Sequence, residues 1–228
     1  MDDITLNQNP KLGSVDRPNS YIGRSLTRDG AKKHLEGKGQ FVDDLILPRM
    51  VNLAFLRSPY AHAEIKSINI NEAKKYPGVI NIYIAEDMDK VCKPWVGVLG
   101  HLGEMRSPEQ SPLVKKIARW QGEPVAIVVA NTRAQAEDAL EAIDIDWLEK
   151  EPQIDMETAL EKDAVVIHKE LGNNLFWTRT VEQGDVQKGF NASSTVVETT
   201  LDFARHTGVT LEPRGIVADW NKSEEKMT

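Results

Sequence analysis

Histidines are the side chains of this sequence best suited to acid–base or metal chemistry, and their spacing builds no site. The five are His34, His62, His101, His168 and His206. No two have the HxxxH spacing that places both rings on one face of a helix, and no acidic or cysteine set completes a metal cage. His62 and His206 stand at the edges of predicted strands. A hydrogen-bonded structural role is favoured there, although histidine titrates near neutral pH.

Carboxylates are the second group of candidates. The paired acids are Asp43-Asp44, Asp144/Asp146 and Glu224-Glu225. The first pair could orient a turn or bind an arginine, and the second is the polar face of a strand. Glu123, in the triplet GEP ahead of a buried strand, has to be paired or hydrogen-bonded to be tolerated there. Glu212 is a similar case, and pairing with Arg214 or Arg205 is favoured over a role near a cofactor.

Phosphate-binding loops and reactive thiols give no further site. Neither GxGxxG nor GxxxxGK[ST] occurs. The glycines within residues 92–114 do not join a strand to a helix, so a flexible loop is favoured. The single cysteine, Cys92, allows no internal disulfide, and a buried or incidental thiol is favoured over a nucleophile. On chemistry alone, the sequence indicates an α+β protein with no complete active site.

Composition and charge limit the kinds of partner and the cellular location that this protein can have. The 228 residues have a formal net charge of −7 and are enough for one large or two small domains. No basic run or aromatic-studded basic face argues for nucleic acid. The N-terminus lacks a basic segment followed by an apolar one, and every apolar run is far shorter than the ~20 residues that span a bilayer. We therefore expect a cytoplasmic protein with no membrane span.

The clearest secondary-structure pattern covers residues 122–148. Residues 125–130 are an unbroken apolar run, typical of a strand buried on both faces. Thr132 can cap a helix, and Gln135 has the spacing of a capping box. Residues 143–147 alternate apolar and acidic side chains, as in a strand with one wet face. So short a crossover predicts that both strands lie parallel in one sheet. The helix between them has one apolar stripe, formed by Ala136, Ala139, Leu140 and Ile143.

Weaker patterns precede this unit. Strands are predicted at 50–57, 64–70, 79–84 and 116–120, and Ile80, Ile82 and Ile84 should share one face of the third. A short extended piece is predicted at 41–44. Residues 92–114 contain three prolines and three glycines, so they predict a long loop of the functional or interface-forming kind.

After Trp147 the chain becomes polar and turn-rich. Residues 184–192 predict a helix capped by Asp185. Residues 195–205 and 214–220 predict strands, and the last residues predict a turn and the start of a returning strand. We expect a hairpin with an open edge, left by truncation or completed by a separate polypeptide.

Six stretches together carry a resemblance to a known family. They are IGRSLTRDGAKKHLEGKGQFVDDL (22–45), LRSPYAHAEIKSINI (56–70), YPGVINIYIAEDM (76–88), QGEPVAIVVANTRAQAEDALEAIDIDW (121–147), GDVQKGF (184–190) and ARHTGVTLEPRGIVADW (204–220). In this order they resemble the N-terminal part of the large, molybdopterin-binding subunit of the molybdenum hydroxylases. That family includes xanthine dehydrogenase, aldehyde oxidase and aerobic carbon monoxide dehydrogenase. The loop PWVGVLGHLGEM and the stretch RHTGVTLEPR are most similar to bacterial carbon monoxide dehydrogenase large chains.

The resemblance implies an α+β fold. An α/β-hammerhead domain, with a mixed sheet and a strand–helix–strand unit, is followed by the first strands of a truncated molybdopterin-binding domain. The expected divisions are a flexible N-terminal segment at 1–20, the hammerhead domain at 21–150, a connector at 151–183 and an incomplete start of the cofactor domain at 184–228.

The resemblance also implies cofactors and partners. The complete subunit would carry molybdenum on molybdopterin, as the cytosine dinucleotide, with FAD and 2Fe-2S clusters on partner subunits. Water would supply the oxygen inserted into a C–H bond or added to CO. The family's catalytic residues correspond to positions past residue 228, so no catalytic, cofactor-binding or metal-binding residue is carried over, and none of these cofactors is expected on this chain alone. The packing or interface candidates are Arg24, Arg57, His62, Glu123, His206 and Glu212.

Two interpretations remain open. The chain is the N-terminal part of a large subunit and needs the rest of it for activity, or it is a separate non-catalytic scaffold or assembly subunit that joins a cofactor-domain chain by strand addition. A weaker third interpretation is a small-molecule-binding domain that uses the 92–114 loop. The residues present do not choose among CO, aldehydes, purines and other N-heterocycles as substrate.

Overall fold

The computed structural model describes residues 28, 30–97, 99, 101–204, 206–210 and 212–228. Contacts divide the chain into a larger unit, residues 48–202, and a smaller unit that combines residues up to 47 with 203–228. The larger unit contains β1 (Asn52–Arg57), β2 (Ala63–Asn69), η3 (Ala73–Lys75), β3 (Val79–Tyr83), α2 (Ala85–Met88), β4 (Trp95–Val96), β5 (Glu109–Gln110), β6 (Ile117–Ala118), β7 (Pro124–Ala130), α3 (Arg133–Leu140), β8 (Asp144–Glu149), η4 (Thr158–Leu160), η5 (Lys169–Leu171) and α4 (Val186–Ala192). The smaller unit contains α1 (Ala31–Leu35), η2 (Val42–Asp44), β9 (Trp220–Asn221) and β10 (Lys226–Met227).

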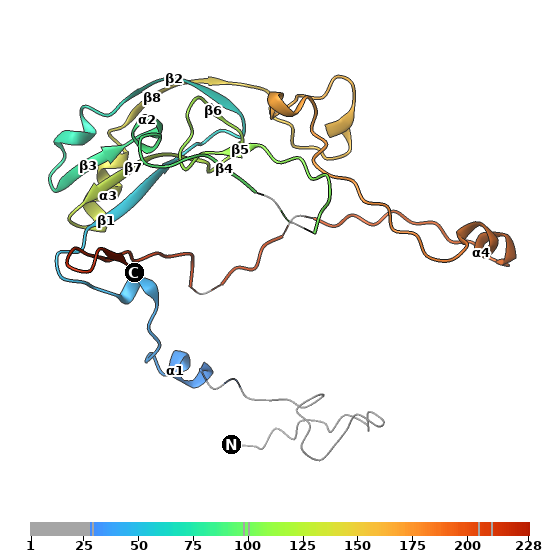
Figure 1. Ribbon diagram of the computed structural model, residues 1–228, viewed down its shortest axis with the longest axis horizontal. Helices are drawn as coiled ribbons and strands as arrows, with labels where there is room; N and C mark the ends of the chain where they lie inside the picture. The colour runs from blue at the N-terminus through green and yellow to red at the C-terminus, as the bar shows by residue number, and fades with distance from the viewer. Residues whose placement is uncertain (1–27, 29, 98, 100, 205, 211) are drawn as a thin grey trace, which may run out of the picture. The chain divides into compact units, whose positions relative to one another are not determined.

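Strand β7 is the centre of the first sheet. Its neighbours β1 and β3 both pair with it antiparallel, in the order β1-β7-β3, and α3 packs against these strands (Figure 1). Val128 is opposite Ala54 on one side and Ile82 on the other. Small side chains let α3 approach the sheet closely, since Ala136 and Ala139 are fully buried. The predicted buried strand is confirmed, and so is the apolar helix stripe over Ala136, Ala139 and Leu140. Ile143, the fourth predicted member, lies past the end of α3 and packs against the same core.

Strand β8 does not return to the sheet of β7, so the predicted parallel crossover is wrong. It pairs antiparallel with β2 in a second sheet of order β6-β2-β8. The physical reason is that β1 and β3 already occupy both edges of β7, which leaves β8 no edge to pair with. Ile65 lies opposite Trp147, and the buried core of this sheet also contains Val125 of β7. Strand β7 therefore contributes side chains to two cores, which explains its continuous apolar run.

A bulge in β3 breaks the predicted isoleucine face. Val79 is opposite Ala130 and Asn81 is opposite Val129, so Ile80 has no partner in the register. As a result Ile80 is 55% exposed while Ile82 is 2% exposed. The expectation that Ile80 shares a face with Ile82 was wrong. The extra residue at the bulge turns the Ile80 side chain away from the face on which Ile82 lies.

At the start of α3, one of the two hydrogen bonds of the predicted capping box is present. The Thr132 hydroxyl accepts from the Gln135 amide at 3.3 Å. The Gln135 side chain instead reaches the turn at Gly78, whose φ is +80°. Its Oε1 is buried and has no hydrogen-bond partner among the described residues. The cap therefore relies on Thr132 alone.

Three predicted extended segments are wrong in whole or in large part. Residues 42–44 form the 3₁₀ turn η2, in which the Asp44 carboxylate accepts from the Phe41 amide at 2.8 Å. The described residues within 195–204 are in no strand, because no neighbouring strand supplies hydrogen bonds to them. Of the strand predicted at 214–220, only Trp220 is in a strand. It lies in β9 opposite Met227 of β10, so the final hairpin is present but short. Asp185 caps α4 through the Lys188 amide at 2.9 Å, as predicted.

The long loop and the connector are fastened to each other. Arg106 donates to the Asn173 side chain at 3.0 Å and to the Phe176 carbonyl through its amide at 2.9 Å. The Trp177 indole donates to the Gly103 carbonyl at 3.0 Å. Within the loop, β4 and β5 form a short antiparallel pair. Residues that the sequence left without structure are thus positioned by one another.

In the part of the chain that the structure describes, no helix combines the length and the apolar character needed to cross a bilayer.

Candidate functional site

Glu123 stands at the start of β7, and its carboxylate is satisfied by the backbone. Oε2 accepts from the Arg119 amide at 2.6 Å, while the Glu123 carbonyl accepts from the Ser58 amide at 2.9 Å. Burial raises the pKa of this carboxyl above its usual value, and the Arg119 hydrogen bond and the charges of Arg119 and His168 oppose that rise only in part. The expectation that Glu123 is hydrogen-bonded is met by a main-chain donor.

Arg57 lies at the same end of the first sheet. Its guanidinium donates to the Gly122 carbonyl at 2.8 Å and is 5.7 Å from the centre of the Phe55 ring. Gly122, with φ +93°, immediately precedes Glu123. Arg57 and Glu123 are therefore brought to one turn, where both hold main-chain groups in place.

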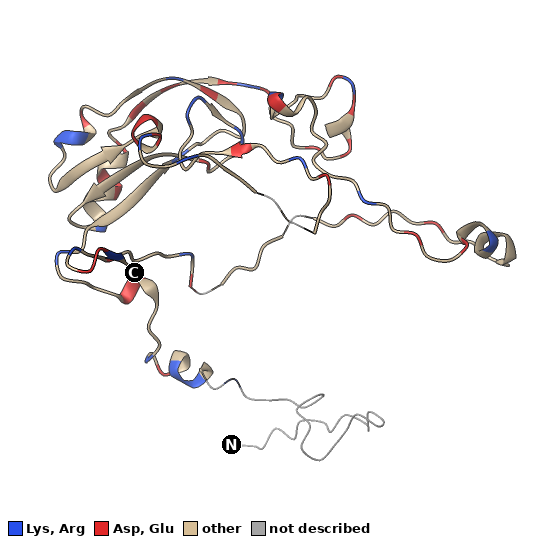
Figure 2. Ribbon diagram, in the orientation of Figure 1, with Lys and Arg blue, Asp and Glu red and all other residues tan. Residues whose placement is uncertain are grey.

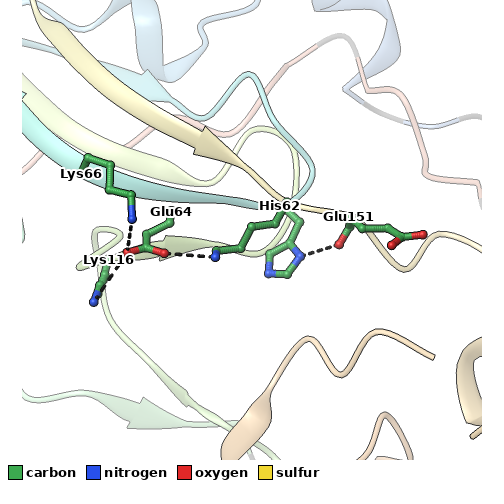
Figure 3. A network of polar contacts seen from close by, with 6 residues as sticks. His62, Glu64, Lys66, Lys116 and Glu151 are labelled. Carbon is green, nitrogen blue, oxygen red and sulfur yellow. Dashed lines mark hydrogen bonds and ion pairs between the residues drawn. The ribbon is translucent and has the colours of Figure 1, made fainter. Parts of the chain in front are cut away.

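His62 is a buried structural residue at 7% exposure. Its Nδ1 is 2.6 Å from the Glu151 carbonyl oxygen (Figure 3). Because a carbonyl only accepts, Nδ1 carries the proton. The His62 carbonyl also accepts from the Lys150 amide at 2.9 Å. The ring and its backbone thus fasten the end of β8 to the start of β2.

The remaining candidates do not join these residues into one site. In the smaller unit, Glu212 accepts from the Val42 amide at 3.0 Å rather than pairing with Arg214, so the favoured arginine pairing is not seen. Arg205, the other predicted partner, and Arg24 lie outside the described residues. His206 is exposed and sits edge-on to the Phe203 ring at 4.9 Å.

A cleft of about 790 Å³ lies in the larger unit between the loop, the start of β7 and the connector. Glu123 is on its wall, opposite a pair that the sequence did not single out. In that pair His168 Nδ1 is 3.2 Å from a Glu170 carboxylate oxygen. The pKa of Glu170 is lowered, first by a hydrogen bond from its own backbone amide and then by His168. The cleft thus has two carboxylates with opposite preferences for a proton.

Two other residues with organising roles were missed. Asn174 donates to the carbonyls of Ala159 and Val165 at 2.9 and 3.0 Å and accepts from the Ile167 amide at 3.1 Å. The carboxylate of Glu64 contacts three lysines, and this holds its pKa at about 2, chiefly through the bonds from Lys66 and Lys150. Only the Glu64–Lys66 spacing is visible in the sequence, because the other contacts depend on strand register.

The donor set does not fit a metal centre. Among the described residues, no three His, Cys, Asp or Glu side chains gather as ligands for a metal ion. The cleft is lined by Trp120, prolines and ion pairs rather than by a backbone cradle for phosphate groups. We therefore derive no chemical step through a metal or pterin on these residues.

Comparison with known proteins defines the class of this fold. Residues 36–151 match the description "Aldehyde oxidase and xanthine dehydrogenase, a/b hammerhead domain", and residues 167–228 match "Molybdopterin cofactor-binding domain". The predicted α+β class, a hammerhead domain followed by the start of a molybdopterin-binding domain, is confirmed. Because the first match covers more than half of the chain, the protein belongs to the aldehyde oxidase and xanthine dehydrogenase family of molybdopterin-dependent oxidoreductases.

Individual relatives agree with this assignment. The chain is 28% identical over 221 residues to the nicotine 6-hydroxylase large subunit of Paenarthrobacter nicotinovorans, covering 96% of this chain and 27% of that one. It is 34% identical over 164 residues to the carbon monoxide dehydrogenase large chain of Afipia carboxidovorans, covering 71% and 20%. The crystal structure of quinoline 2-oxidoreductase from Pseudomonas putida 86 matches with a TM-score of 0.68 and 32% identity, covering 77% and 22%. The chain spans about a quarter of the length of such relatives.

Proposed function

We propose that this chain supplies the hammerhead domain and the first segment of the cofactor-binding domain of a molybdenum hydroxylase large subunit. The observation that supports this most is the ordered pair of family matches, at 36–151 and 167–228, over about a quarter of the relatives' length. We place the domain limits near residues 150 and 184, with the connector between them. In this proposal the chain is catalytically incomplete alone.

The exposure of the second match supports the need for further polypeptide. Every described residue of 184–228 is exposed except Val217, which is half-buried. Val197, Leu201, Val209 and Ile216 are each at least 85% exposed. We take these exposed apolar side chains to mark segments that another stretch of polypeptide covers. Residues 184–228 would then fold onto the remainder of a molybdopterin-binding domain.

The complete subunit would hold molybdenum on molybdopterin, as the cytosine dinucleotide, which supplies the oxidation chemistry when bound. Iron–sulfur and FAD subunits would be the partners, and the assembly would be cytoplasmic. The reaction would be hydroxylation with water-derived oxygen, or oxidation of CO. Relatives named for nicotine, xanthine and carbon monoxide span several substrate classes, so no substrate is assigned.

Hydrogen exchange tests this proposal. The chain is measured alone and after co-expression with a polypeptide that carries the rest of a molybdopterin-binding domain from a relative. We expect the amides of residues 195–204 to exchange rapidly alone and to be protected at least about tenfold in the complex. Equal exchange in both samples would contradict the proposal. Independent folding and activity of the chain alone would also contradict it.

A separate scaffold or assembly subunit remains the alternative, and the same exposed segment supports it. The two proposals differ in covalent continuity. In the alternative, the natural partner is a distinct polypeptide that co-purifies with this chain and adds a strand to it. Reading the gene past the codon for Thr228 separates them: an open frame encoding more of the cofactor domain favours the first proposal. A stop codon followed by a separate cofactor-domain gene favours the second.

A third proposal is small-molecule binding at the 92–114 loop. The cleft of about 790 Å³ favours it, since this volume lies within the range of ligand pockets. Saturable binding of a small molecule to the isolated chain, abolished by changes at Glu123 and His168, would support it. Absence of any hit in a fragment screen monitored at the cleft residues would contradict it.

A further inference from the structure

Three lysines converge on one carboxylate in the second sheet. The ammonium groups of Lys66 and Lys150 are each 3.0 Å from a carboxylate oxygen of Glu64, and that of Lys116 is 3.7 Å away (Figure 3). Lys66 belongs to β2, Lys116 immediately precedes β6 and Lys150 immediately follows β8. All three strands of the sheet therefore send a positive charge to the same point.

The cluster keeps an excess of two positive charges, because Glu64 neutralises one of three. The exposed fractions of the lysine side chains are 44% for Lys66, 72% for Lys116 and 32% for Lys150, whereas that of Glu64 is 16%. Each ammonium has three donors, and one carboxylate cannot accept from all nine. Hydrogen-bond donors and positive charge therefore face solvent, and the negative charge is largely covered.

Apolar side chains flank the cluster on the same face of the sheet. Leu148 and Ile117 lie opposite Glu64 in the register of β8 and β6. Leu148 is 45% exposed. Asp146, two residues before Leu148 on β8, bounds the basic region on one side. Protein interfaces combine apolar side chains, which are buried on association, with charged side chains that stay closer to solvent.

We propose that this surface, defined by Lys66, Lys116, Lys150 and Leu148, docks an acidic segment of a partner protein that also carries apolar side chains. Charge complementarity identifies the occupant: carboxylates would share the ammonium donors that Glu64 leaves free. Nucleic acid fits less well, because the chain has a net charge of −7 and a carboxylate stands at the centre of the cluster. Basic and acidic segments are interspersed along the described chain rather than forming a basic stripe (Figure 2).

Glu64 has a specific role in this proposal. It occupies the lysines in the free protein, so an incoming carboxylate competes with it. Removing its charge should therefore strengthen binding of an acidic partner, although it weakens the contacts among the strands. A purely structural carboxylate would show only the second effect.

The test measures binding of a fluorescent peptide of alternating glutamate and leucine to the full chain by anisotropy. A peptide with lysine in place of each glutamate, and a single-stranded oligonucleotide, are the comparison probes. The variants are Lys66→Glu with Lys116→Glu, and Glu64→Gln. Lys162→Glu, at an exposed position of the connector, is the matched control. Circular dichroism of each variant verifies folding.

We expect the double lysine variant to bind the acidic peptide about tenfold more weakly and the basic peptide more tightly, and Lys162→Glu to change neither by more than about twofold. Glu64→Gln should bind the acidic peptide more tightly. Raising salt from about 20 to about 200 mM should weaken the parent interaction, because the charges are exposed. Equal binding by the parent and the double variant would overturn the proposal, as would weaker binding by Glu64→Gln or a preference for the oligonucleotide.

Discussion

The Oε2 atom of Glu123 accepts a 2.6 Å hydrogen bond from the backbone amide of Arg119. This bond closes the turn between β6 and β7, and it lies on the wall of the cleft. An acceptor is needed at this position because the Arg119 amide is part-buried. The negative charge itself is not needed for the bond, and burial disfavours that charge.

Replacement of Glu123 separates these two effects. Glu123→Leu should lower the free energy of unfolding by about 1–3 kcal/mol, because the Arg119 amide loses its acceptor. Glu123→Gln keeps an acceptor, so it should cost less than about 1 kcal/mol. Urea unfolding of both variants at pH 7 measures the difference. Equal destabilisation by Leu and Gln would show that the hydrogen bond is not what holds the turn.

The raised pKa of Glu123 also predicts a pH dependence. The folded state binds this proton more tightly than the unfolded state, so its contribution to stability is fully present below about pH 4.5 and is lost as the pH rises through the folded pKa. Glutamine does not titrate, so as the pH is raised from low to neutral the stability of Glu123→Gln should increase relative to that of the parent. A difference that is constant from pH 4 to pH 7 would contradict this assignment.

Glu64 predicts the opposite pH dependence. Its pKa in the folded protein is about 2, below the usual value of 4.5, so its contribution is present above about pH 4.5 and is lost as the pH falls through about 2. Glu64→Gln should be less stable than the parent at pH 7, and the difference should shrink as the pH approaches 2. Thermal unfolding across this range measures it.

Gly78 is required by the turn that receives Gln135. Its φ is +80°, and a Cβ there would lie 2.2 Å from Gln135 Oε1. Gly172 has nearly the same φ, +79°, with nothing within 4 Å of its Cβ position. Gly172→Ala should thus cost about 1 kcal/mol from backbone strain alone, and Gly78→Ala should cost more. Equal midpoints of urea unfolding for the two variants would show that the Gln135 side chain moves aside at no cost in stability.

Asn174 should keep the connector in its folded conformation. Asn174→Ala removes three hydrogen bonds at once and leaves the Ile167 amide without its partner, so we expect a loss of about 1–3 kcal/mol. Limited proteolysis should cut residues 158–175 faster than in the parent. Asn71→Ala, an exposed asparagine near η3, is the control. Unchanged cleavage of the connector would contradict this role.

Local patterns in the sequence were sufficient for the elements whose neighbours are close along the chain. The apolar run of β7, the Thr132 cap and the alanine stripe of α3 were all predicted, because each depends on side chains within a few residues. The Asp185 cap of α4 is a similar case. The six stretches of family resemblance predicted the hammerhead class, which the family matches confirm.

Features that depend on pairing between distant strands were not predictable in this way. The sheet that β8 joins depends on which edges of β7 are already taken, and the exposure of Ile80 depends on one extra residue in β3. The lysines around Glu64 lie in or next to three different strands, and Lys150 is 86 positions from Glu64 in sequence. The His168–Glu170 pair lies at the same cleft as Glu123 only because the connector folds back to the start of β7. No local pattern in the sequence indicates that fold.

Molybdenum analysis shows whether this chain needs the rest of a molybdopterin-binding domain to hold the cofactor. The chain is purified alone and in complex with a polypeptide that supplies the rest of a molybdopterin-binding domain, and the metal content of both samples is measured by mass spectrometry. We expect molybdenum in the complex at close to one atom per pair of chains and essentially none on this chain alone. Stoichiometric molybdenum retained by the isolated 228-residue chain would contradict it.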